Sequence, residues 1–338
     1  MSNTQTSYTP REPILVTGSA GFIGSTFLPL LLSKFSASEI HSVDALTYAG
    51  SRENLLDLPE SSNHSFHRLN ITDFDSLQKK FQNFEFKTVI HFAAETHVDR
   101  SLNSPDLFFR TNLIGTTNLL KLAKEFAVER FIHISTDEVY GPTPDGIEFD
   151  ESAPLNPSSP YAASKAAADL ATLSYSKSYD LPVIIIRSTN NYGPRQYPEK
   201  LIPLLISRAS QGKALPLYGD GKYERDWIHV EDFSRAVIAI LECGKAGEIY
   251  NVAGENRILN IEIAERIREL VGVAESKIEF VANRPGHDRR YRIRTDKVKT
   301  LGFSPQIDFD EELAKVVKWY LKTPQRLAKI STGAAVEK

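Results

Sequence analysis

Short apolar runs alternate with helix-like stretches along residues 14–186. Each run has the length of a strand, and the runs contain little polar alternation, which is typical of strands buried on both faces of a parallel sheet. The expected strands cover residues 14–17, 39–43, 65–69, 88–92, 131–134 and 183–186. The expected helices cover residues 22–35, 113–127 and 161–179, with a kink or a later start predicted from Pro29. This order predicts an α/β fold with a doubly wound parallel sheet.

The chain changes character after Arg187, where Pro, Gly and Tyr become frequent through Gly221. A helix and a strand return over residues 230–252, and helices follow. We therefore expect a Rossmann domain and a smaller, discontinuous α/β substrate domain. The Rossmann domain takes residues 11–187 and 222–255, the substrate domain takes 188–221 and 256–325, and tails cover 1–10 and 326–338. The polar composition of residues 1–10 predicts that this tail is disordered.

Composition narrows the class of protein. The chain has 338 residues, of which 41% are hydrophobic and 25% charged, so it can bury a sizeable core. A net charge of −3 argues against a general nucleic-acid binder, because phosphate binding needs a basic excess. No apolar run approaches the roughly 20 residues of a membrane-spanning helix. Residues 1–10 lack the apolar core of a signal peptide.

The cysteine and histidine positions carry two expectations. Cys243 is the only cysteine, so no intrachain disulfide can form, and we expect a small core residue there. The absence of disulfides and of an export signal favours the cytoplasm. No metal is expected, because metal-ligand spacing is missing among His41, His64, His67, His91, His97, His133 and His229.

Three glycines, Gly18, Gly21 and Gly24, separate the first expected strand from the first expected helix. In this context they predict a dinucleotide site: a tight turn, close approach of the backbone to a pyrophosphate, and close helix–strand packing. Asp44 follows at the end of the next strand, about 20 residues after Gly24. Its carboxylate would bind the adenosine ribose and repel a 2′-phosphate, which favours NAD over NADP. The alternatives are a glycine-rich turn without a ligand, and Asp44 as a cap of the strand end.

Tyr161 and Lys165 are four residues apart on an expected helix, and hence share a face. A nearby ammonium, together with a positive nicotinamide ring, would lower the pKa of the phenol so that it can accept a proton from a sugar hydroxyl. Lys165 can also hold the nicotinamide ribose. The alternative is a pair on the surface, which the preceding glycine motif makes less favourable.

Asp137 and Glu138 follow Thr136 at the end of an expected strand. Oxidation of a hexose at C4 acidifies the C5 proton, and loss of water then needs a base for C5–H and an acid for the C6 hydroxyl. Glu138 as base and Asp137 as acid fit this need if their environments separate the two pKa values. Neighbours on a regular strand point to opposite faces, so the strand must have ended and turned before them. The alternative is a solvated acidic pair before the turn at Gly141.

These residues together resemble the nucleotide-sugar 4,6-dehydratases, of the dTDP-glucose 4,6-dehydratase type, within the extended short-chain dehydrogenase/reductase family. The resemblance covers residues 12–322. It rests on residues 17–24, 93–101, 135–141, 157–165, 190–194, 198–203, 225–227 and 284–291. Asn70 and Asn283 depart from the family pattern, since each stands where an Asp is usual. Thr96 and Thr189 stand where Cys or Ser is common.

The resemblance implies a role for each matching residue. The NAD site would be lined by Gly18, Gly21, Phe22, Ile23, Gly24, Asp44, Asn70, Ile71, Ala93, Ala94, Thr111, Tyr161, Lys165 and Asn191. The sugar nucleotide would contact Thr96, Thr136, Asn190, Lys200, Leu201, Pro216, Tyr218, Arg225, Asn260, Arg284 and His287. The catalytic set would be Thr136, Asp137, Glu138, Tyr161 and Lys165, with Thr136 polarising the C4 oxygen. The resemblance also implies a homodimer formed through the helices expected at 113–127 and 161–179.

The activity implied is the NAD-dependent dehydration of a nucleotide hexose to its 4-keto-6-deoxy sugar. We expect dTDP-glucose as substrate, with UDP-glucose as the alternative. A 4-epimerase needs the Tyr–Lys pair but no acid and base for elimination, so Asp137 and Glu138 argue against it. A decarboxylase would bring a substrate carboxylate against Asp137. A regulatory NAD sensor without catalysis would not need Tyr161 and Lys165, and both are present.

Overall fold

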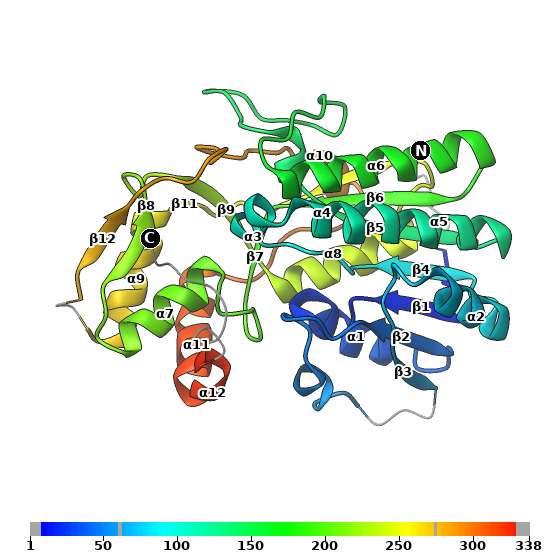
Figure 1. Cartoon of the computed structure of the whole chain (residues 1–338), viewed down its shortest axis with the longest axis horizontal. Helices are drawn as coiled ribbons and strands as arrows, with labels where there is room; N and C mark the ends of the chain where they lie inside the picture. Colours follow the sequence, from blue (N-terminus) through cyan, green and yellow to red (C-terminus); the bar gives the residue numbers. More distant parts are fainter. Residues whose placement is uncertain (1–7, 60–62, 274–275, 329–338) are drawn as a thin grey trace.

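A computed structural model describes residues 8–59, 63–273 and 276–328 of the chain. Its centre is a seven-stranded sheet with the strand order β10-β6-β5-β4-β1-β2-β3, and every neighbouring pair is parallel. The predicted doubly wound parallel sheet is therefore confirmed (Figure 1). The strands are β1 (Ile14–Thr17), β2 (Ile40–Asp44), β3 (His64–Arg68), β4 (Thr88–His91), β5 (Arg130–Thr136), β6 (Val183–Ser188) and β10 (Ile249–Val252).

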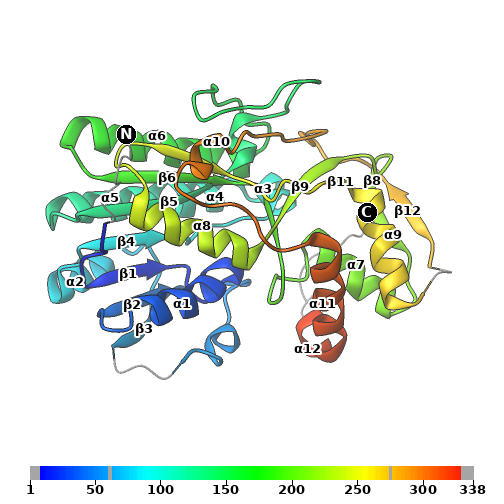
Figure 2. The same ribbon diagram turned by 180° about the vertical axis from the view of Figure 1, so that it is seen from behind.

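Alternate side chains of these strands bury against helices on the two faces of the sheet. Ile14 and Val16 point to one face, where they join a cluster with residues of α1 (Phe22–Lys34) and α8 (Val230–Cys243). Leu15 points to the other face and packs with residues of α2 (Phe74–Phe84) and α5 (Thr116–Glu125). The long helix α6 (Pro160–Tyr179) lies beside α5 on that second face, as Figures 1 and 2 show from opposite sides. Both faces of the sheet are therefore covered, as its apolar strands require.

Two expected elements differ in the structure. The helix expected at 113–127 is present as α5, but residues 113–115 at its expected start belong to a π-helical turn, η2 (Phe109–Gly115). The Asn112 side chain forms two hydrogen bonds with the backbone of Glu95, which anchors this wide turn to the strand end after β4. Pro29 lies inside α1, and the helix nevertheless begins at Phe22, directly after the glycine loop. Helix α2 was not among the predicted elements.

The remaining segments form a second hydrophobic cluster at one end of the long axis of the molecule (Figure 1). Its two small sheets have the orders β11-β9-β7 and β12-β8. Their strands are β7 (Asn190–Tyr192), β8 (Leu215–Tyr218), β9 (Glu224–His229), β11 (Arg257–Leu259) and β12 (Ile278–Val281). The helices are α7 (Leu201–Ser210), α9 (Asn260–Val271), α11 (Phe309–Lys322) and α12 (Pro324–Leu327). Short helices elsewhere are η1 (Arg52–Leu55), α3 (Val98–Asn103), α4 (Pro105–Phe108), η3 (Asp137–Tyr140) and α10 (Asp296–Lys299).

Parts of the expected tails pack against the folded chain. The Tyr8 N–H donates to the Glu242 carbonyl at 2.7 Å, and the guanidinium of Arg130 lies 3.9 Å from the centre of the Tyr8 ring. Residues 1–7 and 329–338 of those tails lie outside the described residues. Cys243, expected in the core, is only partly buried at the end of α8. Among the residues that the structure describes, no helix is both long and apolar enough to cross a bilayer.

Candidate active site

The ends of β1 and β4 hold the glycine loop in place. Thr17 and His91 are opposite each other in the register, and their side chains form a buried hydrogen bond of 2.7 Å. The Thr17 hydroxyl also accepts from the Ala93 N–H at 3.3 Å. This contact brings Ala93 against Gly18, so two segments predicted to bind the cofactor meet at one edge of the sheet.

Glycine is required at two positions of this loop. Gly18 has a φ of +71°, and a Cβ there would lie 2.5 Å from the Ala93 nitrogen. A Cβ at Gly24 would lie 2.2 Å from the Gly18 carbonyl oxygen, so α1 can approach the loop only without a side chain. Helix α1 begins after Gly21 with no side-chain cap, so Phe22 and Ile23 present their N–H groups at an open helix N-terminus. The loop therefore has the geometry of an anion cradle.

Asp44 ends β2 beside this loop. Its carboxylate accepts from the Ala20 N–H at 2.9 Å and from the Leu46 N–H at 2.8 Å. Burial raises the pKa of Asp44, and the backbone donors around it oppose that effect. The carboxylate thus does cap the strand end, and it keeps lone pairs that can accept from a further hydroxyl.

The other residues predicted at the cofactor site occupy varied surroundings. Asn70 is exposed and accepts from both the N–H and the hydroxyl of Thr72 at 3.0 Å. Ile71 is buried, Ala94 follows Ala93 after β4, and Thr111 lies in η2. The Asn191 amide donates to Ser188 and Thr189, while its Oδ1 is buried without a hydrogen-bond partner among the described residues.

Tyr161 and Lys165 lie one turn apart on α6, and both are buried. The Lys165 Nζ donates to the Ile134 carbonyl at 2.6 Å, which fixes it at the end of β5. The phenol is hydrogen-bonded to Thr136. Burial lowers the pKa of Lys165 to about 8. The shared face predicted from the spacing is therefore observed.

The side chains around Tyr161 oppose the lowering of its pKa that we expect from Lys165 and a nicotinamide ring together. Burial raises this pKa, and the nearby carboxyl groups of Glu138 and Asp137 raise it further. The ammonium of Lys165 points to a backbone carbonyl and does not outweigh these effects. Ionisation of the phenol therefore needs additional positive charge.

Asp137 and Glu138 lie just where the chain leaves β5. The strand ends at Thr136, and the short helix η3 begins at Asp137. The Thr136 hydroxyl donates to Asp137 Oδ1 at 3.2 Å and accepts from the Glu138 N–H at 3.3 Å. The condition that the strand has turned before the acidic pair is thus met, and the alternative of a solvated pair is wrong for Asp137, of which 3% is exposed.

The two carboxyl groups have different electrostatic surroundings. Burial and the neighbouring Glu138 raise the pKa of Asp137 well above its usual value. Burial also raises the pKa of Glu138, but the cations of Arg284, Arg225 and Lys200 oppose it. Asp137 is therefore the better proton donor and Glu138 the better proton acceptor of the pair.

The cations near Glu138 come from the distal part of the chain and from the loops beside it. Lys200 donates to the Thr96 carbonyl at 2.7 Å. Arg284 donates to Asp99 at 3.0 Å, and the Tyr218 hydroxyl donates to the same carboxylate at 2.9 Å. Asp99 thus joins two residues predicted to bind the nucleotide, a role that the sequence analysis did not assign to it.

Arg225 and His287 occupy the same region. Arg225 is buried, donates to the Asp288 carbonyl at 3.0 Å and lies 4.7 Å from the centre of the Tyr291 ring. His287 stacks on Tyr223 with ring centres 3.8 Å apart, and burial lowers its pKa to about 3. Its Nδ1 lies 2.7 Å from Asn283 Oδ1, so the Asn at the departing position 283 holds this imidazole. The other predicted residues lie at element ends or on edge strands: Asn190 on β7, Leu201 on α7, Pro216 on β8 and Asn260 on α9.

A further buried group near Lys165 was not predicted. Asp169 lies one turn beyond Lys165 on α6 and contacts Arg187 on β6. The sequence did contain a signal for Asp169. It follows Lys165 by four residues, as Lys165 follows Tyr161, so all three lie on one face of the helix.

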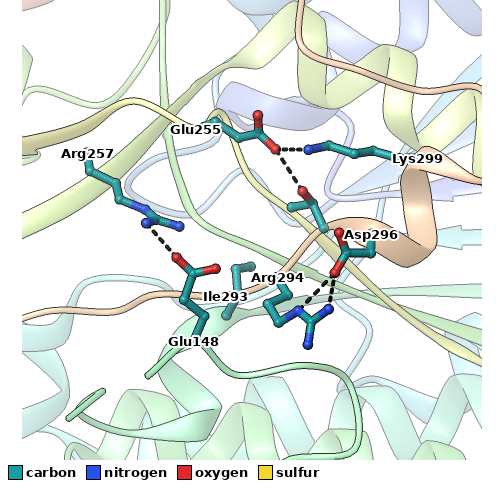
Figure 3. Close-up of a pocket in the computed structure, with 8 residues that line it drawn as sticks. Glu148, Glu255, Arg257, Ile293, Arg294, Asp296 and Lys299 are labelled. Carbon is teal, nitrogen blue, oxygen red and sulfur yellow. Dashed lines mark hydrogen bonds and ion pairs between the residues drawn. The ribbon is translucent and has the colours of Figure 1, made fainter. Parts of the chain in front are cut away.

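A separate hollow of about 420 Å³ is lined mostly by charged side chains, which Figure 3 shows. Its charged groups pair with one another: Arg257 with Glu148 at 2.6 Å, Arg294 with Asp296 at 2.6 Å, and Lys299 with Glu255. It contains none of the predicted site residues, so we do not assign the substrate to it. Among the described residues, no group of three His, Cys, Asp or Glu side chains is arranged to hold a metal ion.

The chain is similar to known proteins in both sequence and structure. The profile of the family described as GDP-mannose 4,6 dehydratase matches residues 15–316. The low-salt glycan biosynthesis protein Agl12 of Haloferax volcanii is 46% identical over 308 residues, which cover 91% of this chain and 98% of that protein. dTDP-glucose 4,6-dehydratase 1 of Escherichia coli K12 is 43% identical over 347 aligned residues, covering 95% of this chain and 96% of that protein.

A solved structure agrees with the sequence comparisons. The crystal structure of DesIV, a dTDP-glucose 4,6-dehydratase from Streptomyces venezuelae with NAD and TYD bound, superposes with a TM-score of 0.89 at 42% identity. The match covers 92% of this chain and 98% of that one. The similarity therefore extends over both the central sheet and the distal segments.

Proposed function

Because the chain belongs to the GDP-mannose 4,6-dehydratase family, we propose that it dehydrates dTDP-glucose to the 4-keto-6-deoxy sugar nucleotide. The enzyme class is that of an NAD-dependent hydro-lyase. One observation carries the proposal: the turn at the end of β5 places the acidic pair Asp137 and Glu138 beside the phenol of Tyr161. A site with a redox phenol, an acid and a base supports elimination as well as oxidation.

The residues of the glycine loop fit NAD. The open N-terminus of α1 and the glycines at 18 and 24 would receive the pyrophosphate, and Asp44 would hold the adenosine ribose. Lys165 and Asn191 would hold the nicotinamide end. NAD held there would supply the hydride chemistry, as the acceptor of hydride from C4 of the sugar and its donor at C6.

The side chains supply the proton transfers. Tyr161 takes the proton of the C4 hydroxyl, and the Thr136 hydroxyl would turn from Asp137 to donate a hydrogen bond to the C4 oxygen. Glu138 then takes the C5 proton, and Asp137 protonates the departing C6 hydroxyl, which leaves as water. Glu138 gives its proton back to C5 when hydride is restored at C6. The raised pKa of Asp137 supports its assignment as the acid, and the cations near Glu138 support that residue as the base.

The nucleotide diphosphate requires cations and amides, and the distal segments provide them. Arg225, Arg284 and Lys200 approach Glu138 from that side, so a diphosphate bound to them would present its sugar to the acidic pair. Thr96 would hold a sugar hydroxyl. Further contacts are proposed for Asn190, Leu201, Pro216, Tyr218, Asn260 and His287.

The alternatives are separated by particular residues. A 4-epimerase has no use for the buried acid at Asp137. UDP-glucose dehydration would use the same chemistry and differ only in the nucleoside, whose uracil lacks the thymine methyl group and whose ribose carries a 2′-hydroxyl. The 43% identity with the Escherichia coli dTDP-glucose enzyme favours the thymidine nucleotide.

Three further features belong to the proposal. The Rossmann domain is proposed to take residues 11–187 and 222–255, and the substrate domain 188–221 and 256–325. A homodimer is proposed through the faces of η2, α5 and α6, where Ile114 and Leu170 are 51% and 58% exposed. The compartment is proposed to be the cytoplasm, which suits a chain with one cysteine.

One experiment tests the activity. The protein is incubated with NAD in two reactions, one with dTDP-glucose and the other with UDP-glucose. The product of each reaction is analysed by mass spectrometry. We expect loss of one water from dTDP-glucose and much slower loss from UDP-glucose. Isomerisation without a change in mass would instead identify an epimerase.

A further inference from the structure

A buried carboxylate shares the helix face of Tyr161 and Lys165, and the mechanism above makes no use of it. Tyr161, Lys165 and Asp169 follow one another at intervals of four residues on α6, so they lie along one side of the helix. Asp169 is 0% exposed. An ionised carboxylate without charged partners costs several kcal/mol in such a place, so its partners indicate what it does.

Two strands supply the partners of Asp169. Arg187 on β6 is 2% exposed, and its Nε donates to Asp169 Oδ2 at 2.9 Å. His133 on β5 has its Nε2 3.4 Å from Asp169 Oδ1. Burial raises the pKa of Asp169, but the nearby His133 and the charge of Arg187 outweigh burial and bring it below its usual value. The carboxylate is therefore ionised at neutral pH.

The remaining groups around Lys165 add no negative charge. Burial lowers the pKa of His133 to about 4 and that of His91 well below its usual value, so both imidazoles are neutral at pH 7. Tyr140 lies under the guanidinium of Arg187, 4.7 Å from its ring centre, and stays a neutral phenol because burial raises its pKa to about 12. Asp169 is thus the group that supports the ammonium of Lys165 against burial.

The formal charges of this cluster leave one positive charge in excess. Lys165 and Arg187 are cations, and Asp169 is an anion that is bonded to Arg187 and shares a helix face with Lys165. The carboxyl groups of Glu138 and Asp137, and after them that of Asp169, disfavour the ionisation of Tyr161. The excess positive charge is balanced when the phenol becomes a phenolate.

We propose that Asp169 is a positioning residue for the proton transfer at Tyr161: its carboxylate keeps the ammonium charge on Lys165, and Arg187 holds that carboxylate in place. The inference rests on the proposed function, because it concerns the step in which Tyr161 takes the proton of the C4 hydroxyl. Without Asp169, two buried cations would lie close together without an anion. Lys165 would then lose its proton, since a guanidinium retains its own.

The first test needs no catalysis. Asp169→Asn keeps the shape of the side chain and removes the charge, and the free energy of unfolding of the cofactor-free protein is measured against pH. A lysine whose pKa is lower in the folded than in the unfolded state destabilises the fold while it is protonated. The free energy of unfolding therefore rises with pH between those two pKa values. In Asp169→Asn this rise should begin about one pH unit lower than in the unsubstituted protein.

The second test follows the rate of the oxidation step against pH in the protein loaded with NAD and dTDP-glucose. Loss of the Lys165 proton ends activity on the alkaline side, so this limb should move to lower pH by about one unit in Asp169→Asn. A carboxylate that only ties α6 to β6 would lower the rate and the stability without moving either pH midpoint. Such an unmoved midpoint in both measurements would overturn the inference.

Two variants keep the tests decisive. Asp180→Asn, an exposed change at the end of the same helix, should leave both midpoints unchanged. If Asp169→Asn does not fold, the double variant Asp169→Asn/Arg187→Met replaces it, because removing both members of a buried ion pair leaves no unpaired carboxylate or guanidinium. Its shift should again be to lower pH but smaller, because the second cation is removed together with the anion, and no shift in this variant would overturn the inference. Failure of the unsubstituted protein to dehydrate dTDP-glucose would refute the function alone, since the unfolding measurement is independent of it.

Discussion

The hydroxyl of Thr136 accepts a hydrogen bond from the backbone N–H of Glu138 at 3.3 Å, and the chain leaves strand β5 at this bond. Without such a turn, Asp137 and Glu138 would point to opposite faces of the sheet. With it, both carboxyl groups approach Tyr161 and raise the pKa of its phenol. The turn is thus the local feature that allows elimination chemistry to be added to a nicotinamide site.

Glu138→Gln should separate oxidation from dehydration. The amide keeps the volume of the side chain but cannot take the C5 proton, so product formation should fall by about 10²–10⁴-fold. Oxidation at C4 needs Tyr161 and Lys165 and should continue, so reduced nicotinamide should appear in a single turnover with dTDP-glucose and persist. Absorbance of the reduced cofactor and mass spectrometry of the sugar measure the two outcomes.

The control for this variant is Glu125→Gln, an exposed change of the same kind at the end of α5, which should leave both steps unchanged. Full release of dehydrated product by Glu138→Gln would refute the role of Glu138 as the base.

Asp137→Asn should change the pH dependence of elimination. Burial and the charge of Glu138 raise the pKa of Asp137 well above its usual value, so the group is protonated and able to donate at neutral pH. An acid works only while protonated, so the rate of elimination should fall as the pH rises through this pKa. In Asp137→Asn that alkaline dependence should disappear and the rate should be about 10²–10³-fold lower at pH 7.

The decay of the reduced cofactor in single turnovers at several pH values measures this. A variant that keeps the alkaline limb would show that another group donates the proton.

The sequence predicted those parts of the fold and site that depend on neighbours in the chain. The glycine loop, the strand ends and the Tyr161–Lys165 face each lie within one strand–helix unit, so spacing alone located them. Contacts between distant segments could not be read in this way. Asp99 and Arg284 are 185 residues apart, and only the folded chain brings their side chains together.

Local patterns also failed where side-chain contacts outweigh periodicity. The π-helical turn η2 replaces the start of an expected α-helix because Asn112 binds the backbone of Glu95. The spacing of Tyr161 and Lys165 also did not reveal that burial and two carboxyl groups raise the pKa of the phenol. Burial of this kind depends on the packing of whole elements, which the spacing of a motif does not contain.

Gly24→Ala should weaken cofactor binding. The new Cβ would lie 2.2 Å from the Gly18 carbonyl oxygen, so α1 must move away from the loop that would hold the pyrophosphate. Such overpacking costs about 1–3 kcal/mol, and we expect at least about a tenfold loss of NAD affinity. Calorimetric titration with NAD measures it. Ser33→Ala, an exposed change on the same helix, is the control, and equal affinity in the two variants would contradict the proposed site.

Tyr48→Phe should loosen the segment that follows Asp44. The Tyr48 hydroxyl donates to Glu199 Oε1 at 2.7 Å, and the guanidinium of Arg100 lies 3.6 Å from the centre of the Tyr48 ring. The Glu199 side chain is only 5% exposed, so Tyr48→Phe takes a hydrogen-bond donor away from a buried carboxyl oxygen. We expect a loss of about 1–3 kcal/mol in the free energy of unfolding.

The same change should also weaken NAD binding, because the hydrogen bond ties the loop beside Asp44 to the segment that carries Lys200. Tyr179→Phe removes a hydroxyl from a half-exposed ring on α6 and should change stability by less than about 0.5 kcal/mol. Urea unfolding with and without NAD compares the two variants. If Tyr48→Phe loses no more stability than Tyr179→Phe in either condition, then the contact between Tyr48 and Glu199 does not hold the two segments together.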